Sequence, residues 1–433
     1  MSTLMIGIIT LVALIVLLLI GVPVSATMGI LGIAGMIFFS SPAATTMKMG
    51  MTAFQTMNSY NYTVVPLFSL MAMVICHTGV GATLYDFFYK LVGRFRGGLA
   101  IATILACGLF AAISSSSSAT ALTIGLIALP EMQKARYKQS ISTGSIVAGG
   151  TLGPFIPPSS MMILYGIMAE VSITKLFLAG IMPGFVSIIL FCIVIAILTK
   201  RNPDAAPAGP KFTGREIFAS FTKCGEIIIL IIIVLGGLFA GLFTPTEASA
   251  IGASGAIVIT LIRKKLNWRK FINACMGALK NVGMIYAMII GANLMNYFMT
   301  MSGVPKALAE LLLSFNMAPK LIVVCMVVIL MILGMFIDSM GMLYLSMPIF
   351  FPIIKSLGLD PVWFGVIMVA CVEMAVVTPP VGLNLFVVKG IDPSVPMGTI
   401  YKGSYPFFIA QILCIGLIIF IPEIATFLPN LLG

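Results

Sequence analysis

The chain has 433 residues, of which 60% are hydrophobic and only 9% are charged. A soluble domain carries roughly 25% charged residues, so this composition excludes an ordinary soluble enzyme or binding module and predicts an all-α integral membrane protein with many spans. The net charge of +11 comes from lysines and arginines in short loops, a pattern that favours topogenic charge over nucleic-acid binding. The eight cysteines lie in or beside apolar segments without a C-x-x-C pair, which predicts free thiols and no transition-metal site.

The first half of the chain is expected to form spanning helices around one hairpin and one broken helix. In chain order these are helices over 4–20, 25–41 and 62–78, a hairpin over 97–130, a broken helix over 141–170 and a helix over 175–198. The apolar stretch 97–130 is too long for one span of a ~30 Å hydrocarbon core and too short for two. Basic segments flank it on both sides, so we expect a re-entrant hairpin whose tip is the serine run 114–118.

The second half repeats the first at an offset of 222 residues. The alignment places Pro23 on Pro245, Pro130 on Pro352, and Pro157-Pro158 on Pro379-Pro380. Coincidence in a proline-punctuated membrane protein is the competing interpretation, but the matches share one frame and similar hydropathy. The expected elements are helices over 225–243, 248–262 and 278–299, a hairpin over 321–354, a broken helix over 362–390 and a helix over 403–425. Amphipathic stretches over 82–96 and 266–280 are expected to lie along the membrane surface as arms.

The distribution of basic residues predicts that the two halves have opposite orientations. If the segments 90–96, 134–138, 199–215 and 263–270 are cytoplasmic, one topology places every arginine inside. Both termini are then outside, the first hairpin enters from the cytoplasm and the second enters from the other side. Such an inverted-topology repeat, with two re-entrant hairpins and two broken helices, is the plan of secondary transporters.

Four places interrupt the helices at membrane depth, where non-helical backbone must face protein or a watery cavity. They are the two hairpin tips and the two proline pairs, and their carbonyls and hydroxyls suit a hard cation such as Na⁺. The candidate Na⁺ ligands are Ser114, Ser115, Ser116, Ser117, Gly153, Ile156, Asp338, Ser339, Gly341, Thr378, Pro379 and Gly382. The candidate substrate-binding residues are Ser116, Ser118, Thr120, Ser159, Ser160 and Asn384, while Pro157, Pro158, Pro379 and Pro380 set the geometry of the breaks.

Two acidic residues within apolar segments are further candidates. A carboxylate at bilayer depth is costly and usually functional, so Asp338 is expected either to bind Na⁺ directly or to organise the second hairpin tip. Glu373 is expected to carry a proton or to pack against a hairpin. Structural alternatives remain open for each feature: helix packing by small residues for the serine run, simple kinks for the proline pairs, and a hydrogen-bonding role for Asp338.

Taken together, these motifs resemble the large membrane (DctM or M-type) subunit of tripartite ATP-independent periplasmic (TRAP) transporters. The resemblance is carried by "IGVPVSATMGILG", "SSSSSATA" before "ALPEMQKARY", "GGTLGPFIPPSSMMILYG", "FIDSMGMLYLSMPIFFPI" and "TPPVGLNLFVVKGI". It implies Na⁺-coupled import of an organic acid, such as a C4-dicarboxylate or sialic acid, through the bacterial inner membrane. It also implies two partners, a small four-helix membrane subunit and a periplasmic substrate-binding protein.

The resemblance further implies an elevator mechanism, in which a transport domain slides against a fixed scaffold. The corresponding division is 1–96 and 223–320 for scaffold helices and arms, 97–199 and 321–433 for the two halves of the transport domain, and 200–222 for a cytoplasmic loop. The alternatives are a self-sufficient divalent-anion/Na⁺ symporter, a proton-coupled carrier using Glu373 or Asp338, and a channel. An intramembrane serine hydrolase would need a base, and the only histidine, His77, lies at a predicted helix end; we therefore expect no enzyme.

Overall fold

The computed structural model of the chain describes residues 3–76, 79–314, 317–335, 337, 339–379 and 382–432. Every regular element among these residues is a helix. Five helices are long and apolar enough to cross a membrane, or six if the bent pair Pro42–Met57 and Tyr60–Cys76 forms one span. Several shorter apolar helices of 10–17 residues pack among them. The protein is therefore a multi-pass membrane protein in which half-length helices accompany full spans.

The N-terminal helices match the predicted spans, with one addition. They are α1 (Thr3–Leu19), α2 (Val24–Phe39), α3 (Pro42–Met57), α4 (Val64–Cys76) and α5 (Val80–Val92). No helix was predicted for α3. Its start is well marked, since Ser41 Oγ accepts a hydrogen bond from Ala44 N–H and Pro42 occupies the first turn. A 51° bend separates α3 from the following turn of 3₁₀-helix and α4.

The predicted first hairpin and first broken helix are both present. The hairpin consists of α6 (Gly98–Ser114) and α7 (Ser117–Lys134), and the broken helix consists of α8 (Gln139–Gly150) and α9 (Ser160–Ala169). The long α10 (Ile173–Arg201) follows. Ala205 O and Ala206 O of the next segment accept hydrogen bonds from Lys138 N–H and Gly97 N–H at 2.8 and 3.0 Å, so this segment packs against the base of the hairpin.

The second half departs from the expected boundaries in several places. Its first elements are α11 (Gly214–Ile231), one π-helical turn, α12 (Gly237–Phe239), α13 (Pro245–Ile262), α14 (Trp268–Ser302) and α15 (Val304–Ser314). The expected loop 200–222 is already helical from Gly214, because Thr213 and Glu216 form a reciprocal capping box. The helix expected over 225–243 continues from α11 through the π-helical turn and ends at Phe239. The arm 266–280 and the span 278–299 are one continuous helix, α14.

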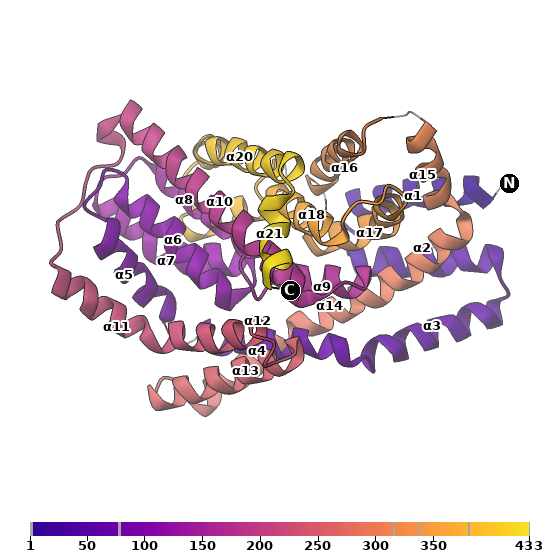
Figure 1. Ribbon diagram of the computed structural model, residues 1–433, viewed down its shortest axis with the longest axis horizontal. Coiled ribbons are helices and arrows are strands. Elements are labelled where there is room, and N and C mark those ends of the chain that lie inside the picture. The colour runs from indigo at the N-terminus through magenta and orange to yellow at the C-terminus, as the bar shows by residue number, and fades with distance from the viewer. Residues whose placement is uncertain are drawn as a thin grey trace.

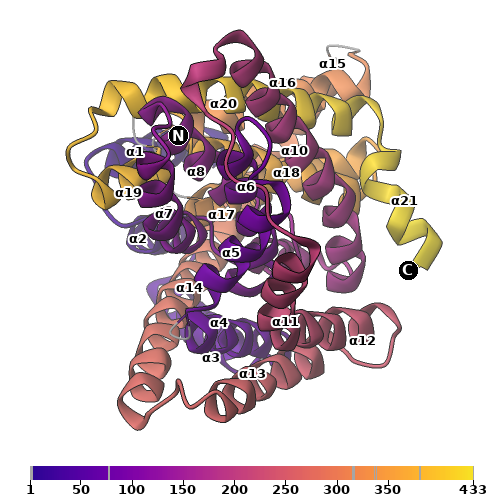
Figure 2. The same cartoon turned by 90° about the vertical axis from the view of Figure 1, so that its left-hand side faces the viewer.

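The remaining elements contain the second hairpin and the second broken helix. They are α16 (Pro319–Gly334), α17 (Ser339–Ser356), α18 (Pro361–Ala375), α19 (Leu383–Ile391), α20 (Met397–Phe420) and α21 (Glu423–Leu432). The span expected over 403–425 therefore begins earlier, ends at Phe420 and is followed by a separate helix. Figure 2 shows this last helix at the edge of the molecule, where it packs mainly on α10.

Many helix boundaries follow the sequence offset of 222 residues. Shifted by this offset, α7 falls on 339–356, which is the range of α17, and α6 falls on 320–336, close to α16. In the same way α2 corresponds to α13, α8 to α18, α9 to α19 and α10 to α20. The hairpin and the interrupted helix thus occur once in each half at equivalent positions.

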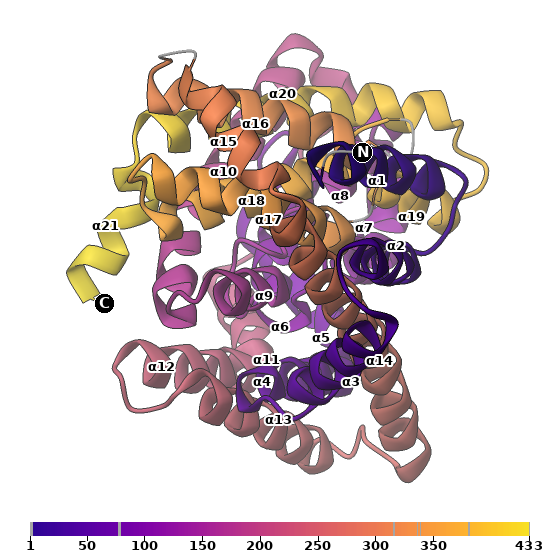
Figure 3. The same ribbon diagram turned by 90° about the vertical axis from the view of Figure 1, so that its right-hand side faces the viewer.

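Contacts between the two halves hold the molecule together. The most extensive ones join α2 to α14, α13 to α4 and α8 to α20. Figure 1 shows α13 with α4 and α11 along the lower edge and α20 above α10 and α18, while Figure 3 shows α14 as one long helix passing α2 and α3. Glycine makes the α2–α14 approach possible: a Cβ on Gly32 would lie 2.7 Å from Met295 N, and one on Gly291 would lie 2.5 Å from Ser25 O.

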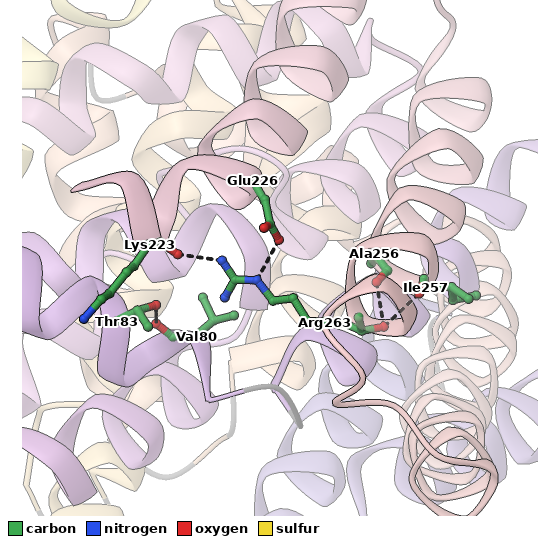
Figure 4. Close-up of polar contacts among 8 residues, drawn as sticks. Val80, Thr83, Lys223, Glu226, Ala256, Ile257 and Arg263 are labelled. Atoms are coloured by element: carbon green, nitrogen blue, oxygen red, sulfur yellow. Dashed lines mark hydrogen bonds and ion pairs between the residues drawn. The ribbon is translucent and has the colours of Figure 1, made fainter. Parts of the chain in front are cut away.

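A polar clamp joins α11 to the end of α13, as Figure 4 shows. Arg263 Nε donates to Glu226 Oε2 at 2.6 Å, and Arg263 Nη2 donates to Lys223 O at 2.7 Å. Arg263 is the C-cap residue of α13, so the guanidinium fixes the last turn of one helix to the side of another. This clamp lies in the basic segment 263–270 that the sequence analysis placed on the cytoplasmic side.

Candidate functional site

The serine run forms the tip of the first hairpin. Ser115 ends α6 with φ = 51° in the left-handed region, and Ser116 caps α7 by accepting a hydrogen bond from Ala119 N–H at 3.4 Å. Ser114 Oγ lies 2.6 Å from Thr120 Oγ1, which closes the two helices against each other. Serine suits this turn because its hydroxyl satisfies backbone groups that the helix ends leave free.

Two serines of the tip connect it to the interrupted helices of both halves. Ser115 Oγ donates to Pro158 O at 2.5 Å, and Pro158 belongs to the break between α8 and α9. Ser117 Oγ donates to Glu373 Oε2 near the end of α18. The tip therefore lies at the crossing point of one broken helix from each half of the chain.

The first break runs from 151 to 159 and packs closely under the hairpin tip. A Cβ on Gly153 would lie 3.2 Å from both Ser116 C and Ser117 N, so the backbone of the tip approaches the break directly. The peptide bond between Pro157 and Pro158 is cis. Ser159 caps α9 by accepting a hydrogen bond from Met162 N–H at 3.3 Å.

Hydrogen bonds join the two helix ends at the second break, between α18 and α19. Thr378 Oγ1 donates to Met374 O at 2.8 Å, and Asn384 N–H donates to Val376 O at 3.0 Å. Gly382 begins the new helix with φ = 42°, a left-handed conformation that glycine adopts without the steric cost of a Cβ. The predicted residues Pro380 and Asp338 lie outside the described residues.

A cavity of about 240 Å³ opens where these elements meet. Its described lining includes all five serines of the first tip, Ser160 of α9, Ser339 of the second tip and Glu373 of α18. The opposite wall comes from α4 and α14, which contribute Ser69 and Asn281. No lysine, arginine or histidine is among the described lining residues, so hydroxyls, one amide and one carboxyl group give the cavity its polarity.

Several predicted residues lie behind this cavity instead of on its surface. Thr120 and Ser159 are buried, and their hydroxyls already have partners within the protein. Asn384 is fully buried behind the tip, next to Gly150. The remaining described positions that were predicted but do not line the cavity are Gly153, Ile156, Pro157, Pro158, Gly341, Thr378, Pro379 and Gly382.

The sequence analysis did not name the residues of α4 and α14 that line the cavity. These are mostly apolar, including Val65, Phe68 and Met284, with Ser69 and Asn281 as the polar exceptions. A serine and an asparagine within apolar membrane helices were the available signal. The sequence at Ser69 and Asn281 does not show that α4 and α14 face the hairpin tip. The position of these helices depends on the contacts between the two halves.

The arrangement as a whole defines a class of protein. Helices that stop at membrane depth expose backbone and helix ends, and such sites occur where polar ligands or ions are bound inside a membrane protein. A multi-pass helical protein with two hairpins, two interrupted helices and a polar cavity at their junction has an architecture typical of membrane transporters.

Comparisons with known proteins give the family. The family model described as tripartite ATP-independent periplasmic transporter, DctM component, matches residues 11–424. The chain belongs to this family and is a large permease protein of the TRAP class, which confirms the resemblance seen in its motifs. Its relatives are named as permease proteins, and permeases are not enzymes.

Two relatives and one solved structure illustrate the match. The chain is 34% identical over 408 residues to the C4-dicarboxylate TRAP transporter large permease protein DctM of Pseudomonas aeruginosa, with 94% of each chain covered. It is 31% identical over 424 residues to the sialic acid TRAP transporter permease protein SiaT of Haemophilus influenzae, covering 96% of this chain and 67% of that one. Its fold resembles that of the YdaH transporter of Alcanivorax borkumensis, with a TM-score of 0.61 at 16% identity over 83% of this chain and 85% of that one.

Proposed function

We propose that this chain is the large permease subunit of a Na⁺-coupled TRAP transporter that imports an organic acid by an elevator mechanism. The observation that carries the proposal is the cavity where the first hairpin tip, both interrupted helices and the second hairpin meet α4 and α14. Hairpins and interrupted helices from both halves form this site, and α4 and α14 border it on one side. Such a site suits a domain that carries its ligand along stationary helices.

The helix correspondence at 222 residues supports an inverted repeat. The contacts are reciprocal: α2 packs on α14 of the other half, and α13, the equivalent of α2, packs on α4. The hairpin–helix contacts repeat in the same way, with α7 on α19 and α17 on α9. In the proposed scheme α2, α4, α13 and α14 belong to the scaffold, while the hairpins and interrupted helices belong to the moving domain.

Two further cavities beside α14, away from the central one, support alternating access. Two adjoining cavities of about 630 and 460 Å³ share Tyr62, Asn293, Asn296 and Thr300 among their lining residues. The larger cavity lies between α14 and the ends of α9 and α17, the smaller one lies between α14 and α3, and both are toward the other end of α14 from Asn281. With a rise of about 1.5 Å per residue, the twelve positions from 281 to 293 separate these levels by roughly 18 Å. The moving domain would carry its site between two such openings.

The lining of the central cavity supports a small anionic substrate without a guanidinium clamp. The hydroxyls of Ser116 and Ser118 and the N-terminal end of α7 offer hydrogen-bond donors, and helix N-termini favour negative charge. Na⁺ bound at the tip and the breaks would add positive charge beside the carboxylate. C4-dicarboxylates and sialic acid, which the names of the relatives mention, are the substrate classes we propose to test first.

The proposed assembly has three parts and lies in the bacterial inner membrane. The partners are a small four-helix membrane subunit and a periplasmic substrate-binding protein, with both termini of this chain on the periplasmic side. The exposed apolar surface of α3, including Phe54 and Met57, provides one face on which a membrane helix or lipid could pack.

Reconstitution tests the proposal. We would place this chain and its small subunit in liposomes, add the binding protein loaded with its acid, and impose Na⁺, proton or no gradients. The expected result is uptake only with all components and an inward Na⁺ gradient. Uptake by this chain alone would favour a self-sufficient symporter, and uptake that follows only the pH gradient would favour a proton-coupled carrier.

A further inference from the structure

The helix α3 presents a row of polar side chains to the α3–α14 cavity, the smaller of the two cavities beside α14, with a volume of about 460 Å³. Polar side chains on membrane helices face protein or a watery cavity and mark paths for ligands. Those of α3 and the residue position that follows it recur at intervals typical of one helix face. They are Lys48, Thr52, Gln55, Thr56 and Ser59.

The helix α14 presents a matching row from the opposite side. Asn293, Asn296, Tyr297 and Thr300 line the same cavity and have the spacing of one helix face. The two helices are in contact, and Figure 3 shows α3 beside α14. The basic segment 263–270 at the start of α14 is predicted to be cytoplasmic, so this end of the helix is predicted to be periplasmic.

Lys48 is the charged residue of the described lining. Its Nζ atom lies 4.3 Å from the centroid of the Tyr297 ring, a cation–π contact that holds the ammonium group at the cavity wall. None of the ion pairs among the described residues includes Lys48. The larger neighbouring cavity is lined by one basic and one acidic residue, Lys306 and Glu170. The unbalanced positive charge therefore lies in the α3–α14 cavity.

The same cavity offers neutral hydrogen-bond donors. Gln55 of α3 and Asn296 of α14 line it and are exposed, so their amide groups are accessible to a ligand. Asn293 Nδ2 donates to Thr56 Oγ1 at 3.5 Å and links the two helices. An ammonium group together with amide and hydroxyl donors is complementary to a carboxylate, which accepts hydrogen bonds at both oxygens.

We propose that the α3–α14 cavity is an outer binding site for the organic acid, in which the Lys48 ammonium group pairs with a carboxylate of the substrate and the amides of Gln55 and Asn296 donate hydrogen bonds to it. The proposal rests on the import of an organic acid proposed above. It adds a second site on the stationary helices, distinct from the central cavity, whose described lining has no basic residue.

The outer site would deliver the acid to the moving domain. The two cavities beside α14 share Tyr62, Ile167, Asn293, Asn296 and Thr300, and the larger one is bordered by α9 and α17 of the proposed moving domain. An acid held by Lys48 therefore lies next to the opening at which that domain would receive it. A cationic lining of this kind raises the local concentration of an anion and its rate of capture by about ten- to a thousandfold.

The test uses proteoliposomes that contain this chain and its small subunit, supplied with the binding protein loaded with a C4-dicarboxylate or with sialic acid. Initial uptake is measured at limiting and at saturating loaded binding protein for the wild type, Lys48→Gln, Lys48→Arg and Asn296→Ala. The matched control is Lys175→Gln, which removes an exposed lysine that lines neither cavity and lies on the same predicted side of the membrane. Docking of the unloaded binding protein is measured separately for each variant.

We expect Lys48→Gln to lower uptake at limiting loaded binding protein at least fivefold, with a smaller loss at saturation and unchanged docking. The difference from the wild type should shrink in high salt, because salt screens the attraction between the lysine and the acid. Lys48→Arg keeps the charge and should retain most of the uptake. Asn296→Ala should lose about half of it, and Lys175→Gln should behave as the wild type.

The outcomes separate this inference from the function on which it rests. If the wild type takes up neither acid, the proposed function itself is contradicted. If the wild type transports and Lys48→Gln matches it at limiting binding protein, only the outer site is overturned. Weaker docking in Lys48→Gln would mean that Lys48 contacts the binding protein, which also overturns the site. If Lys48→Gln fails to insert, Asn296→Ala decides, and wild-type uptake in that variant overturns the site.

Discussion

Replacement of Gly403 by alanine probes the contact that joins α8 of the first half to α20 of the second. A Cβ on Gly403 would lie 2.0 Å from Ser140 O, and one on Gly144 would lie 2.2 Å from Gly403 O. Real Cβ contacts are essentially never shorter than 3.0 Å, so the helices would have to separate by about 1 Å. Overpacking of this kind costs about 1–3 kcal/mol.

Alanine also favours the helix, by up to about 1 kcal/mol relative to glycine, and this gain must be removed from the comparison. Gly416 provides the control, because it lies in the same helix and a Cβ there has no neighbour within 4 Å. Both variants share the helix gain, so the difference between them isolates the clash. Thermal unfolding of the purified protein should place Gly403→Ala below the wild type and Gly416→Ala at or above it.

A Gly403→Ala variant as stable as Gly416→Ala would contradict the predicted clash between α8 and α20. That result would mean that α8 and α20 separate without cost and do not form a rigid unit. The moving domain proposed above needs such a unit, because hairpins and interrupted helices from both halves must travel together. The outcome therefore bears on the mechanism as well as on packing.

Three further predictions concern charged residues. Asp338→Asn should weaken Na⁺ dependence of uptake more than it weakens expression or folding, and unchanged coupling in vesicles would remove Asp338 from the ion site. Hydrogen bonds from Ser394 and Gln133 hold the pKa of Asp392 below its usual range, so its contribution to stability is present at neutral pH and lost as the pH falls through that lowered pKa; Asp392→Asn should flatten the acid limb of a stability–pH profile. The Arg263–Glu226 pair, in which Glu226 is exposed and Arg263 is partly buried, should contribute about 1 kcal/mol or less, so Glu226→Gln should lower thermal stability only slightly and the loss should shrink in high salt.

The hairpins and breaks could be predicted because the residues that form them are poor helix formers within apolar segments that would otherwise be helical. Five serines within an apolar run and a pair of adjacent prolines leave the backbone few alternatives. The structure breaks the helices at these positions, with α6 ending at Ser114 and α8 ending at Gly150. The 222-residue offset predicted the equivalent breaks in the second half, even where the residues differ.

The helical segments that were not predicted carry local sequence signals that a search based on hydropathy does not use. Thr213 and Glu216 have the spacing of a capping box, and the structure forms one. Asn267 caps α14 by accepting a hydrogen bond from Lys270 N–H at 2.8 Å, and no proline follows before residue 305, so the arm and the span continue as one helix. α3 is amphipathic and less apolar than a spanning helix, which is why a search for apolar runs passes over it.

The part of the candidate site formed by the hairpin tips and the breaks was predictable from the sequence, and the part formed by α4 and α14 was not. The sequence predicts the tips and breaks that contain Ser114–Ser118, Ser160 and Ser339, and these residues line the cavity. Ser69 and Asn281 line it because α4 and α14 pack where they do, and such contacts depend on how the two halves combine. Glu373 stood out by its charge, whereas its contact with Ser117 joins positions 256 residues apart and emerges only from the fold.

The most direct test of the account measures the distance between the scaffold and the moving domain. Spin labels on Lys134, at the end of α7, and Arg269, at the start of α14, should give two distance populations that differ by more than the ~5 Å of one helical turn. Their ratio should change when Na⁺ and the substrate acid are added. Labels on Ile262 and Arg269, both in the proposed scaffold, should give one unchanged distance. A single Lys134–Arg269 distance under every condition, in a complex that transports, would contradict the elevator.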